Sequence, residues 1–234
     1  MKDKNTVGIT HTIRLNAMNH VVNMHLAGMQ AREIRQELED AGVRKSIIPV
    51  LLSWTHRNYE LINDALICCA SLPQSDWMPL HWVVLSVNYP FWHSIGTISG
   101  RLLRLQKMIT GSQVITRSIE KMGEKETVIR GVGHVMRSFI DFGVLTGLKY
   151  IGDNQEEFYQ CQPQLEITDP MVIMLLLESV LLNNPGRSGA MGDIVNHPAL
   201  FPFRLPVIYS ETIKRHSDRI SVHQYSDHTL LTIE

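Results

Sequence analysis

Arg130, His134 and Arg137 form a set of hydrogen-bond donors at helical spacing near the middle of the chain. They are separated by four and three residues, so on an α-helix they lie along one stripe. A guanidinium presents a planar fork of N–H groups that matches phosphate oxygens and the O6 and N7 atoms of guanine. The chemistry that such a stripe predicts is recognition of phosphates and base edges, that is, binding of double-stranded DNA.

The element expected to position this stripe is an amphipathic helix over 125–142. Its apolar residues step by four, three, four and three, as one buried stripe requires, and they are Val128, Val132, Val135, Phe139 and Phe142. Gly143 is expected to end the helix. Lys125 and Thr127 then fall on the remaining faces with the arginines and become further candidate DNA contacts.

The neighbouring segments extend this helix into a predicted winged-helix unit. A helix over 112–122, started by Thr110 or Ser112 and ended by Gly123, precedes it, and a hairpin over 148–161 follows it. The second helix would enter the major groove, and the hairpin would press on the backbone with Lys149 and Tyr150. Both DNA binding and protein docking stay open for this unit, because Glu156 and Glu157 in the hairpin would repel phosphate and because winged helices also dock proteins.

A second candidate interface lies between Gly28 and Leu52. We expect a short helix over 31–41 with Ile34 and Leu38 inward, a turn at Gly42, and a third helix from Lys45 to about Ala70. This order is typical of a helix-turn-helix. The exposed start of the third helix would meet DNA with Arg44, Lys45 and Ser46. A plain three-helix packing unit would use the same residues, and Pro49 could distort the helix.

The charge distribution favours a local rather than a global interaction with a polyanion. The formal net charge is −1. Residues 101–150 nevertheless hold nine basic and four acidic side chains, whereas 151–170 hold five acidic and no basic ones. A basic block beside an acidic one is an electrostatic footprint that the total conceals.

The predicted fold class is mainly α with small β-hairpins, in four parts. These are a flexible arm over 1–14, a helix-turn-helix unit over 15–72, a winged-helix-like unit over 73–183 and a loop-rich segment over 184–234 that ends in a hairpin. Asp76 is expected to cap a helix beginning at Trp77, and after Tyr89-Pro90 another helix is expected to reach Met108. The aromatic cluster of Tyr89, Phe91 and Trp92 with Trp77 and Trp82 is expected in the core.

Several function classes have no support in the sequence. There is no paired-cysteine or HExxH metal motif, no nucleophile elbow, no Walker lysine motif and no GxGxxG, so we expect no catalytic site, metal or cofactor. Three cysteines in no disulfide pattern indicate a reducing compartment. The apolar segment from Met171 to Leu182 is too short to cross a bilayer, and an apolar signal region is absent, so a cytoplasmic protein is expected.

The order of elements over about residues 15–150 resembles the small helical A protein of BREX phage-exclusion systems. The shared pattern is a helix-turn-helix over Gly28 to Leu52, an aromatic joint at Asn88-Tyr-Pro-Phe91, and a helix ending in Asp141-Phe-Gly-Val-Leu145. The resemblance implies DNA binding within a bacterial defence complex. The expected function is therefore non-enzymatic DNA binding as an accessory or regulatory component. The alternative is a scaffold subunit that docks other proteins through the winged unit and the apolar helix over 170–182.

Overall fold

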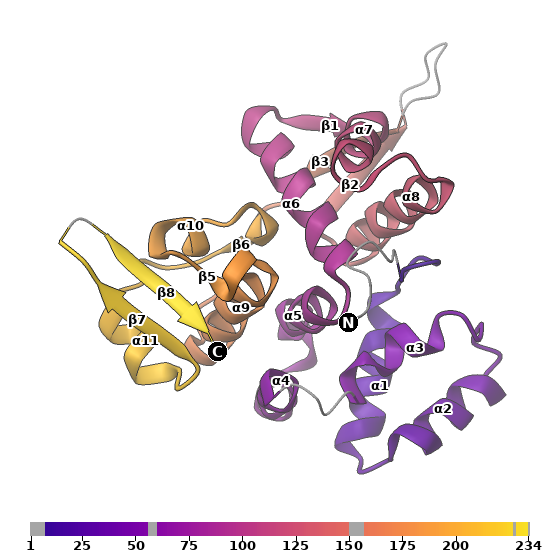
Figure 1. Ribbon diagram of the computed structural model, residues 1–234. Helices are drawn as coiled ribbons and strands as arrows, with labels where there is room; N and C mark the ends of the chain where they lie inside the picture. The colour runs from indigo at the N-terminus through magenta and orange to yellow at the C-terminus, as the bar shows by residue number, and fades with distance from the viewer. Residues whose placement is uncertain (1–7, 56–59, 150–156, 227, 234) are drawn as a thin grey trace.

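The computed structural model describes residues 8–55, 60–149, 157–226 and 228–233. Over these residues the protein is mainly helical with small, mostly antiparallel sheets, as the sequence predicts (Figure 1). None of the helices in those ranges combines the length and apolarity that a bilayer crossing needs.

The N-terminal block packs short helices around the first part of the core. They are α1 (Leu15–Leu26), α2 (Ala31–Asp40), α3 (Ile48–Leu51) and α4 (Glu60–Ser71), with the 3-10 turns η1 (Leu52–Thr55) and η2 (Gln74–Asp76). Ile34 and Leu38 are buried, as predicted.

The single helix expected from Lys45 to Ala70 is wrong. A turn precedes α3, which has only four residues and continues as η1, and α4 begins at Glu60. Two side-chain interactions favour this tighter path. The Trp54 indole N–H donates to His81 Nδ1 in the core at 3.0 Å, and the Thr55 hydroxyl donates to the Leu52 carbonyl. A local hydroxyl bond of this kind competes with the regular helical hydrogen bonds.

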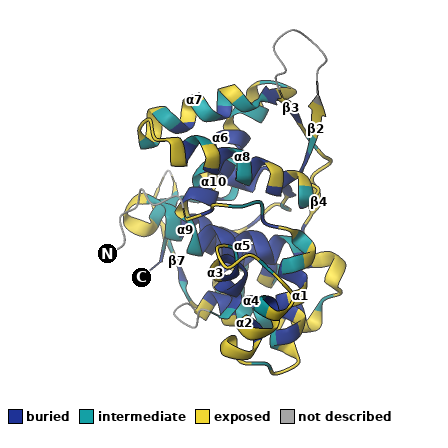
Figure 2. Cartoon of the chain, turned by 90° about the vertical axis from the view of Figure 1, so that its right-hand side faces the viewer, coloured by how far each residue is buried: buried dark blue, intermediate teal, exposed yellow. Residues whose placement is uncertain are grey.

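Two apolar helices form the centre of the molecule. These are α5 (Met78–Asn88) and α9 (Pro170–Asn183), which pack against each other and are buried almost all round. A helix that is apolar on every face belongs inside a core. Apart from Met171 at its start, the helix over 170–182 is therefore largely internal, which leaves little of it exposed for the docking role expected from the sequence. In Figure 2, α5 is dark blue between the exposed surfaces of α2 and α7.

The start of α5 also differs from prediction. Asp76 does not cap it, because the residue before the helix is Trp77 and no side chain caps this end. The Trp77 indole N–H instead donates to the carbonyls of Cys69 and Leu72, so the chain folds back on α4 before the helix begins. Four members of the aromatic cluster predicted for the core are buried, namely Trp77, Trp82, Phe91 and Trp92. Tyr89 is only half-buried, and its hydroxyl donates to the Pro49 carbonyl.

The next unit combines three helices with a small sheet. Its elements are α6 (Pro90–Leu105), β1 (Met108–Thr110), α7 (Gly111–Met122), α8 (Glu126–Asp141), β2 (Leu145–Lys149) and β3 (Glu157–Cys161). The sheet is antiparallel in the order β1-β3-β2, with Tyr159 opposite both Ile109 and Gly147. The preceding helix stops at Leu105 rather than Met108, because Met108 pairs with Gln160 in β1.

The C-terminal part adds two further small sheets and covers the core. It contains β4 (Leu165–Glu166) paired in parallel with β6 (Phe203–Arg204), and the sheet β5-β8-β7 formed by β5 (Ser188–Ala190), β8 (Thr229–Ile233) and β7 (Ile220–Gln224). Between these strands lie η3 (Pro185–Arg187), α10 (Met191–Val195), η4 (Pro198–Leu200) and α11 (Ser210–His216). The predicted terminal hairpin is confirmed as β7–β8.

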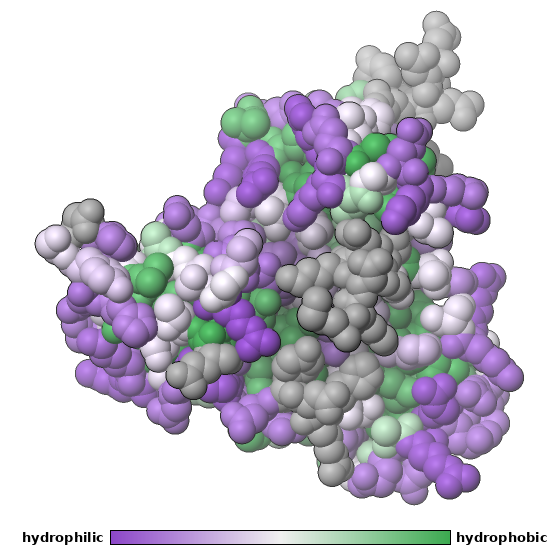
Figure 3. All heavy atoms as spheres, viewed as in Figure 1, coloured by the Kyte–Doolittle hydropathy of each residue, from purple (hydrophilic) through white to green (hydrophobic). Residues whose placement is uncertain are grey.

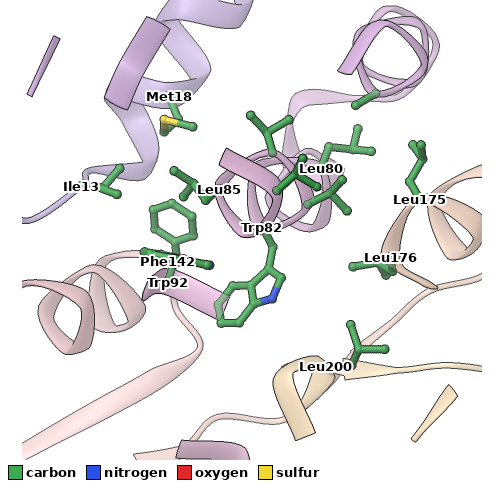
Figure 4. Close-up of a cluster of buried hydrophobic side chains, with 14 of the residues drawn as sticks. Ile13, Met18, Leu80, Trp82, Leu85, Trp92, Phe142, Leu175, Leu176 and Leu200 are labelled. Atoms are coloured by element: carbon green, nitrogen blue, oxygen red, sulfur yellow. The ribbon is translucent and has the colours of Figure 1, made fainter. Parts of the chain in front are cut away.

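Trp82 of α5 joins the units, and Figure 4 shows it among buried side chains from other elements, including Phe142, Leu176 and Leu200. Its ring stacks on Phe139 of α8 at 4.8 Å between centroids, and it meets Phe201 and Phe203 edge-on at 5.8 Å. Gly100 lets α6 approach η4 closely, because a Cβ at this position would overlap the Pro198 carbonyl. Helices α6 and α8 and the C-terminal segment are thereby held on one continuous hydrophobic core.

Candidate nucleic-acid interface

Helix α8 is oriented by its apolar stripe. Val128, Val132, Val135, Phe139 and Phe142 are all buried, as the periodicity predicts. They face the inside of the unit, where α8 packs on α7 and α6 and Phe139 meets Trp92 edge-on at 4.8 Å. The opposite face of α8 is left to polar side chains.

A capping box at the start of α7 and a glycine at its end fix the bounds of this helix, which precedes α8. Thr110 caps α7 with its hydroxyl accepting from the Gln113 N–H, and the Gln113 side chain accepts from the Thr110 N–H in return. This reciprocal capping box satisfies two backbone donors that a helix start leaves free. Gly123 follows α7 with φ +84°, a left-handed conformation that favours glycine and permits the sharp turn into α8.

The predicted stripe on α8 faces solvent. Arg130 and Arg137 are exposed and His134 is half-buried, and Lys125 and Thr127 at the start of the helix are exposed as well. The face visible in Figure 3 is mainly hydrophilic over α7 and α8 and over α2.

The contacts among these side chains leave the guanidiniums of Arg130 and Arg137 available to bind another partner. Arg130 pairs with Glu126 one turn back at 3.2 Å, with 65% and 77% of the two side chains exposed. An ion pair this exposed contributes little and exchanges readily for another partner. The Arg137 guanidinium lies against Gly133 and 3.4 Å from His134 Nδ1.

Arg44, Lys45 and Ser46 do not begin a helix. They lie in the exposed turn that links α2 to α3, and α3 starts only at Ile48. They are exposed cationic and hydroxyl groups on a loop, rather than the first turn of a recognition helix. The structure brings Arg44 and Ser46 to the N-terminal arm, where both approach His11 within 3.5 Å.

Residues 8–14, expected to belong to a flexible arm, follow an extended path beside α8. They form no helix or strand, yet Ile9 and Ile13 are fully buried. The Ile13 N–H donates to Ser138 Oγ at 2.8 Å, and the Leu15 N–H donates to Asp141 Oδ1 at 2.7 Å.

The arm places His11 on His134. The two imidazole rings are stacked, with centroids 5.8 Å apart and planes 8° from parallel. Partial burial, with the positive charges of Arg137, His11 and Arg130, lowers the pKa of His134 below its ordinary value. His134 is therefore held in its neutral form at pH 7 in the free protein.

The candidate wing is described only in its strands. Lys149 lies in β2, but its side chain and residues 150–156, with Tyr150 and Glu156, are outside the described residues. Glu157 in β3 accepts a hydrogen bond from the Tyr159 hydroxyl at 2.6 Å. That acidic group is thus engaged by its own strand, and together with burial it raises the pKa of Tyr159.

Within the described ranges, no three His, Cys, Asp or Glu side chains converge as a metal site would require. Comparison of the chain with family models, curated proteins and solved structures finds no match. What the α8 face binds must therefore be inferred from its geometry and charge.

Two participants in this face were missed in the sequence. His11 lies in a segment without periodicity, and nothing local indicates that it reaches α8. Asp141 has no partner at helical spacing, and its partners are Arg14, at 2.7 Å, and the Leu15 N–H. The only available signal was the spacing of Ile9 and Ile13, four residues apart, which marks two apolar anchors in an otherwise polar arm.

Proposed function

We propose that the unit from α6 to β3 is a winged-helix module that binds duplex DNA through α8. The support is its element order, helix-strand-helix-helix-strand-strand, with the first strand pairing beside the last two in the order β1-β3-β2. In a module of this kind the polar face of the second helix after the first strand enters the major groove. Here that helix is α8, and its polar face carries Arg130 and Arg137.

The observation that carries the proposal is the joining of two basic segments into one surface. The arm links α8 to the turn after α2, so Arg44 contacts one of the two stacked imidazoles and Arg137 contacts the other. The exposed cations of these two segments are Arg44, Lys45, Lys125, Arg130 and Arg137, and the exposed carboxylates at their ends are Asp40, Glu124 and Glu126. Asp141, the last residue of α8, is already paired with Arg14.

A net charge near zero is compatible with this proposal because affinity for DNA depends on local cations. Each neutralised phosphate releases counterions, and this gain needs the positive charges only where the backbone lies. Glu157 in the last strand of the module and Glu166 and Asp169 after it in the chain are acidic, which favours contact with phosphate at the α8 face rather than at this segment.

The proposal includes a setting. The chain acts without catalytic activity of its own, in the cytoplasm where bacterial and phage DNA are found, as a DNA-binding component of a phage-defence complex. This part of the proposal is supported by the resemblance to the BREX A protein and by the absence of a catalytic motif in the sequence.

The direct test measures binding of a labelled duplex at low salt by fluorescence anisotropy. Replacing both Arg130 and Arg137 with Ala removes two donors from the proposed groove-facing stripe. An arginine at a base edge contributes about 1–3 kcal/mol, so affinity should fall by a factor of roughly ten or more. Arg215→Ala, at an exposed position in α11, is the matched control and should bind as wild type does.

Absence of duplex binding by the wild-type chain at low salt would refute the proposal. A protein complex that forms equally at low and high salt, and that survives loss of Arg130 and Arg137, would instead support the docking scaffold. Circular dichroism of each variant separates loss of binding from loss of the fold.

A further inference from the structure

The N-terminal arm has a fixed register on α8. Leu15 bonds to Asp141, Ile13 bonds to Ser138, and His11 stacks on His134. Each step of two residues along the arm therefore moves about one turn back along α8. Because Ile9 and Ile13 are buried on either side of His11 in sequence, the position of this imidazole follows from packing as well as from the stack.

Hydrogen-bond donors converge on the stacked pair from three segments. Arg44 Nη1 is 3.4 Å from His11 Nε2, and Ser46 Oγ is 3.4 Å from His11 Nδ1. At the other ring of the pair, Arg137 Nη2 is 3.4 Å from His134 Nδ1. The Thr10 hydroxyl, 3.1 Å from His11 Nδ1, completes the set.

The protonation of this cluster is set by its neighbours. A guanidinium can only donate, so a ring nitrogen that receives its hydrogen bond must be unprotonated. The charged groups that act on His134 are Arg137, His11 and Arg130, and all of them disfavour the imidazolium. At 3.4 Å these Arg–His contacts are long and weak, so a better acceptor would displace the imidazoles.

A phosphate group has the chemistry to be that acceptor. The charge-assisted hydrogen bonds from a guanidinium to phosphate oxygens are shorter and stronger than those to the nitrogen of a neutral imidazole. Once the arginines turn to phosphate, the ring nitrogens are free to take up protons and become donors themselves. Two guanidiniums, two imidazoliums and a hydroxyl would then surround a dianion or a phosphodiester.

We propose that His11 and His134, with Arg44, Ser46 and Arg137, form one phosphate-binding site that a DNA backbone phosphate fills. The arm is then part of the binding surface, and it joins α8 to the turn after α2. This inference rests on the proposed function for the source of the phosphate. Filling the site couples DNA binding to proton uptake, so the duplex binds more tightly as the pH falls.

The first experiment measures duplex affinity from pH 8 to pH 6 at constant ionic strength. One proton taken up per complex changes affinity tenfold per pH unit at most, so wild type should gain about tenfold or more across this range. His11→Ala and His134→Ala should each flatten the dependence. His20→Ala, an exposed histidine of α1, is the matched control and should retain it.

The second experiment tests the site without DNA. Titration with inorganic phosphate, followed by NMR of the imidazole protons, should move the resonances of His11 and His134 together. It should also raise the pH at which His134 is half-protonated. Arg44→Ala should weaken this response, and His20 should not take part.

The outcomes separate the two proposals. Duplex binding by wild type with no pH dependence, or with a dependence that His11→Ala leaves intact, overturns the phosphate site while DNA binding stands. A response to inorganic phosphate without duplex binding at any pH overturns the DNA assignment and leaves a site for a free phosphate compound. No response of either imidazole to phosphate or to duplex overturns the site.

Discussion

Acid should destabilise the fold through His81, which is completely buried beneath α1 and η1. Its Nδ1 accepts the Trp54 indole N–H at 3.0 Å, and its Nε2 lies 2.7 Å from Asn19 Oδ1 and donates to it. This arrangement uses both ring nitrogens of the neutral imidazole. Burial lowers the pKa of His81 to about 3.

The magnitude follows from the difference between folded and unfolded chains. An unfolded histidine has a pKa of about 6.5, so it is almost fully protonated at pH 5, where folded His81 stays neutral. The contribution is fully present above pH 6.5 and is lost as the pH falls from there toward 3. Between pH 7 and pH 5 this linkage costs about 2 kcal/mol of unfolding free energy.

The assay is urea unfolding of wild type and His81→Gln at both pH values. The variant loses an acceptor for Trp54 and should be less stable at pH 7 by about 1–3 kcal/mol. It should also lose about 2 kcal/mol less than wild type between pH 7 and 5, because it cannot protonate. His93, whose pKa burial also lowers to about 3, titrates alike in both chains and cancels in the comparison. Equal losses in the two proteins would refute this account of the core.

Three further substitutions test other parts of the fold. Gly100→Ala should lower the unfolding free energy by at least about 2 kcal/mol, because the added Cβ meets the Pro198 backbone. Gly192→Ala, which has open space around it, should change the stability little, and equal melting temperatures of the two variants would contradict this. Arg219→Met should cost about 3–5 kcal/mol in urea unfolding, because Glu178 is only 4% exposed and loses its bidentate partner. Adding Glu178→Met should recover most of this loss, and a double variant as unstable as Arg219→Met alone would contradict the reasoning. Asp141→Ala should release the arm, cost about 1–2 kcal/mol and broaden the His11 resonances in NMR spectra; unchanged spectra would show that Asp141 does not hold the arm.

Elements with strong local signals could be predicted from the sequence. The apolar stripe of α8, the Thr110 start and Gly123 stop of α7, and the alternating terminal hairpin all depend on residues close together in the chain. The interior position of the tryptophans followed from their size and apolar surface.

Elements that depend on distant partners were missed or misplaced. The helix expected after Lys45 is interrupted because Trp54 bonds to His81, 27 residues away. The pairing of β5 with β8 joins segments more than 35 residues apart, and β5, with three residues, is too short to show an alternation. The same limit applies to the site, because His11 meets His134 only through the tertiary fold.

The candidate interface could be predicted in its parts but not in its assembly. Spacing on one helix placed Arg130, His134 and Arg137 on a common stripe. The sequence also singled out Arg44, but as the start of a helix, whereas it lies in a turn that reaches the arm. No local pattern indicates that the arm joins these two segments.

The salt dependence of duplex binding tests the central claim most directly. A plot of log affinity against log salt concentration falls by about 0.9 for each phosphate that the protein neutralises. Wild type should show a steep negative slope, and the variant lacking Arg130 and Arg137 should show a slope shallower by about two. A wild-type slope near zero, or an identical slope in the variant, would contradict DNA binding by the α8 face.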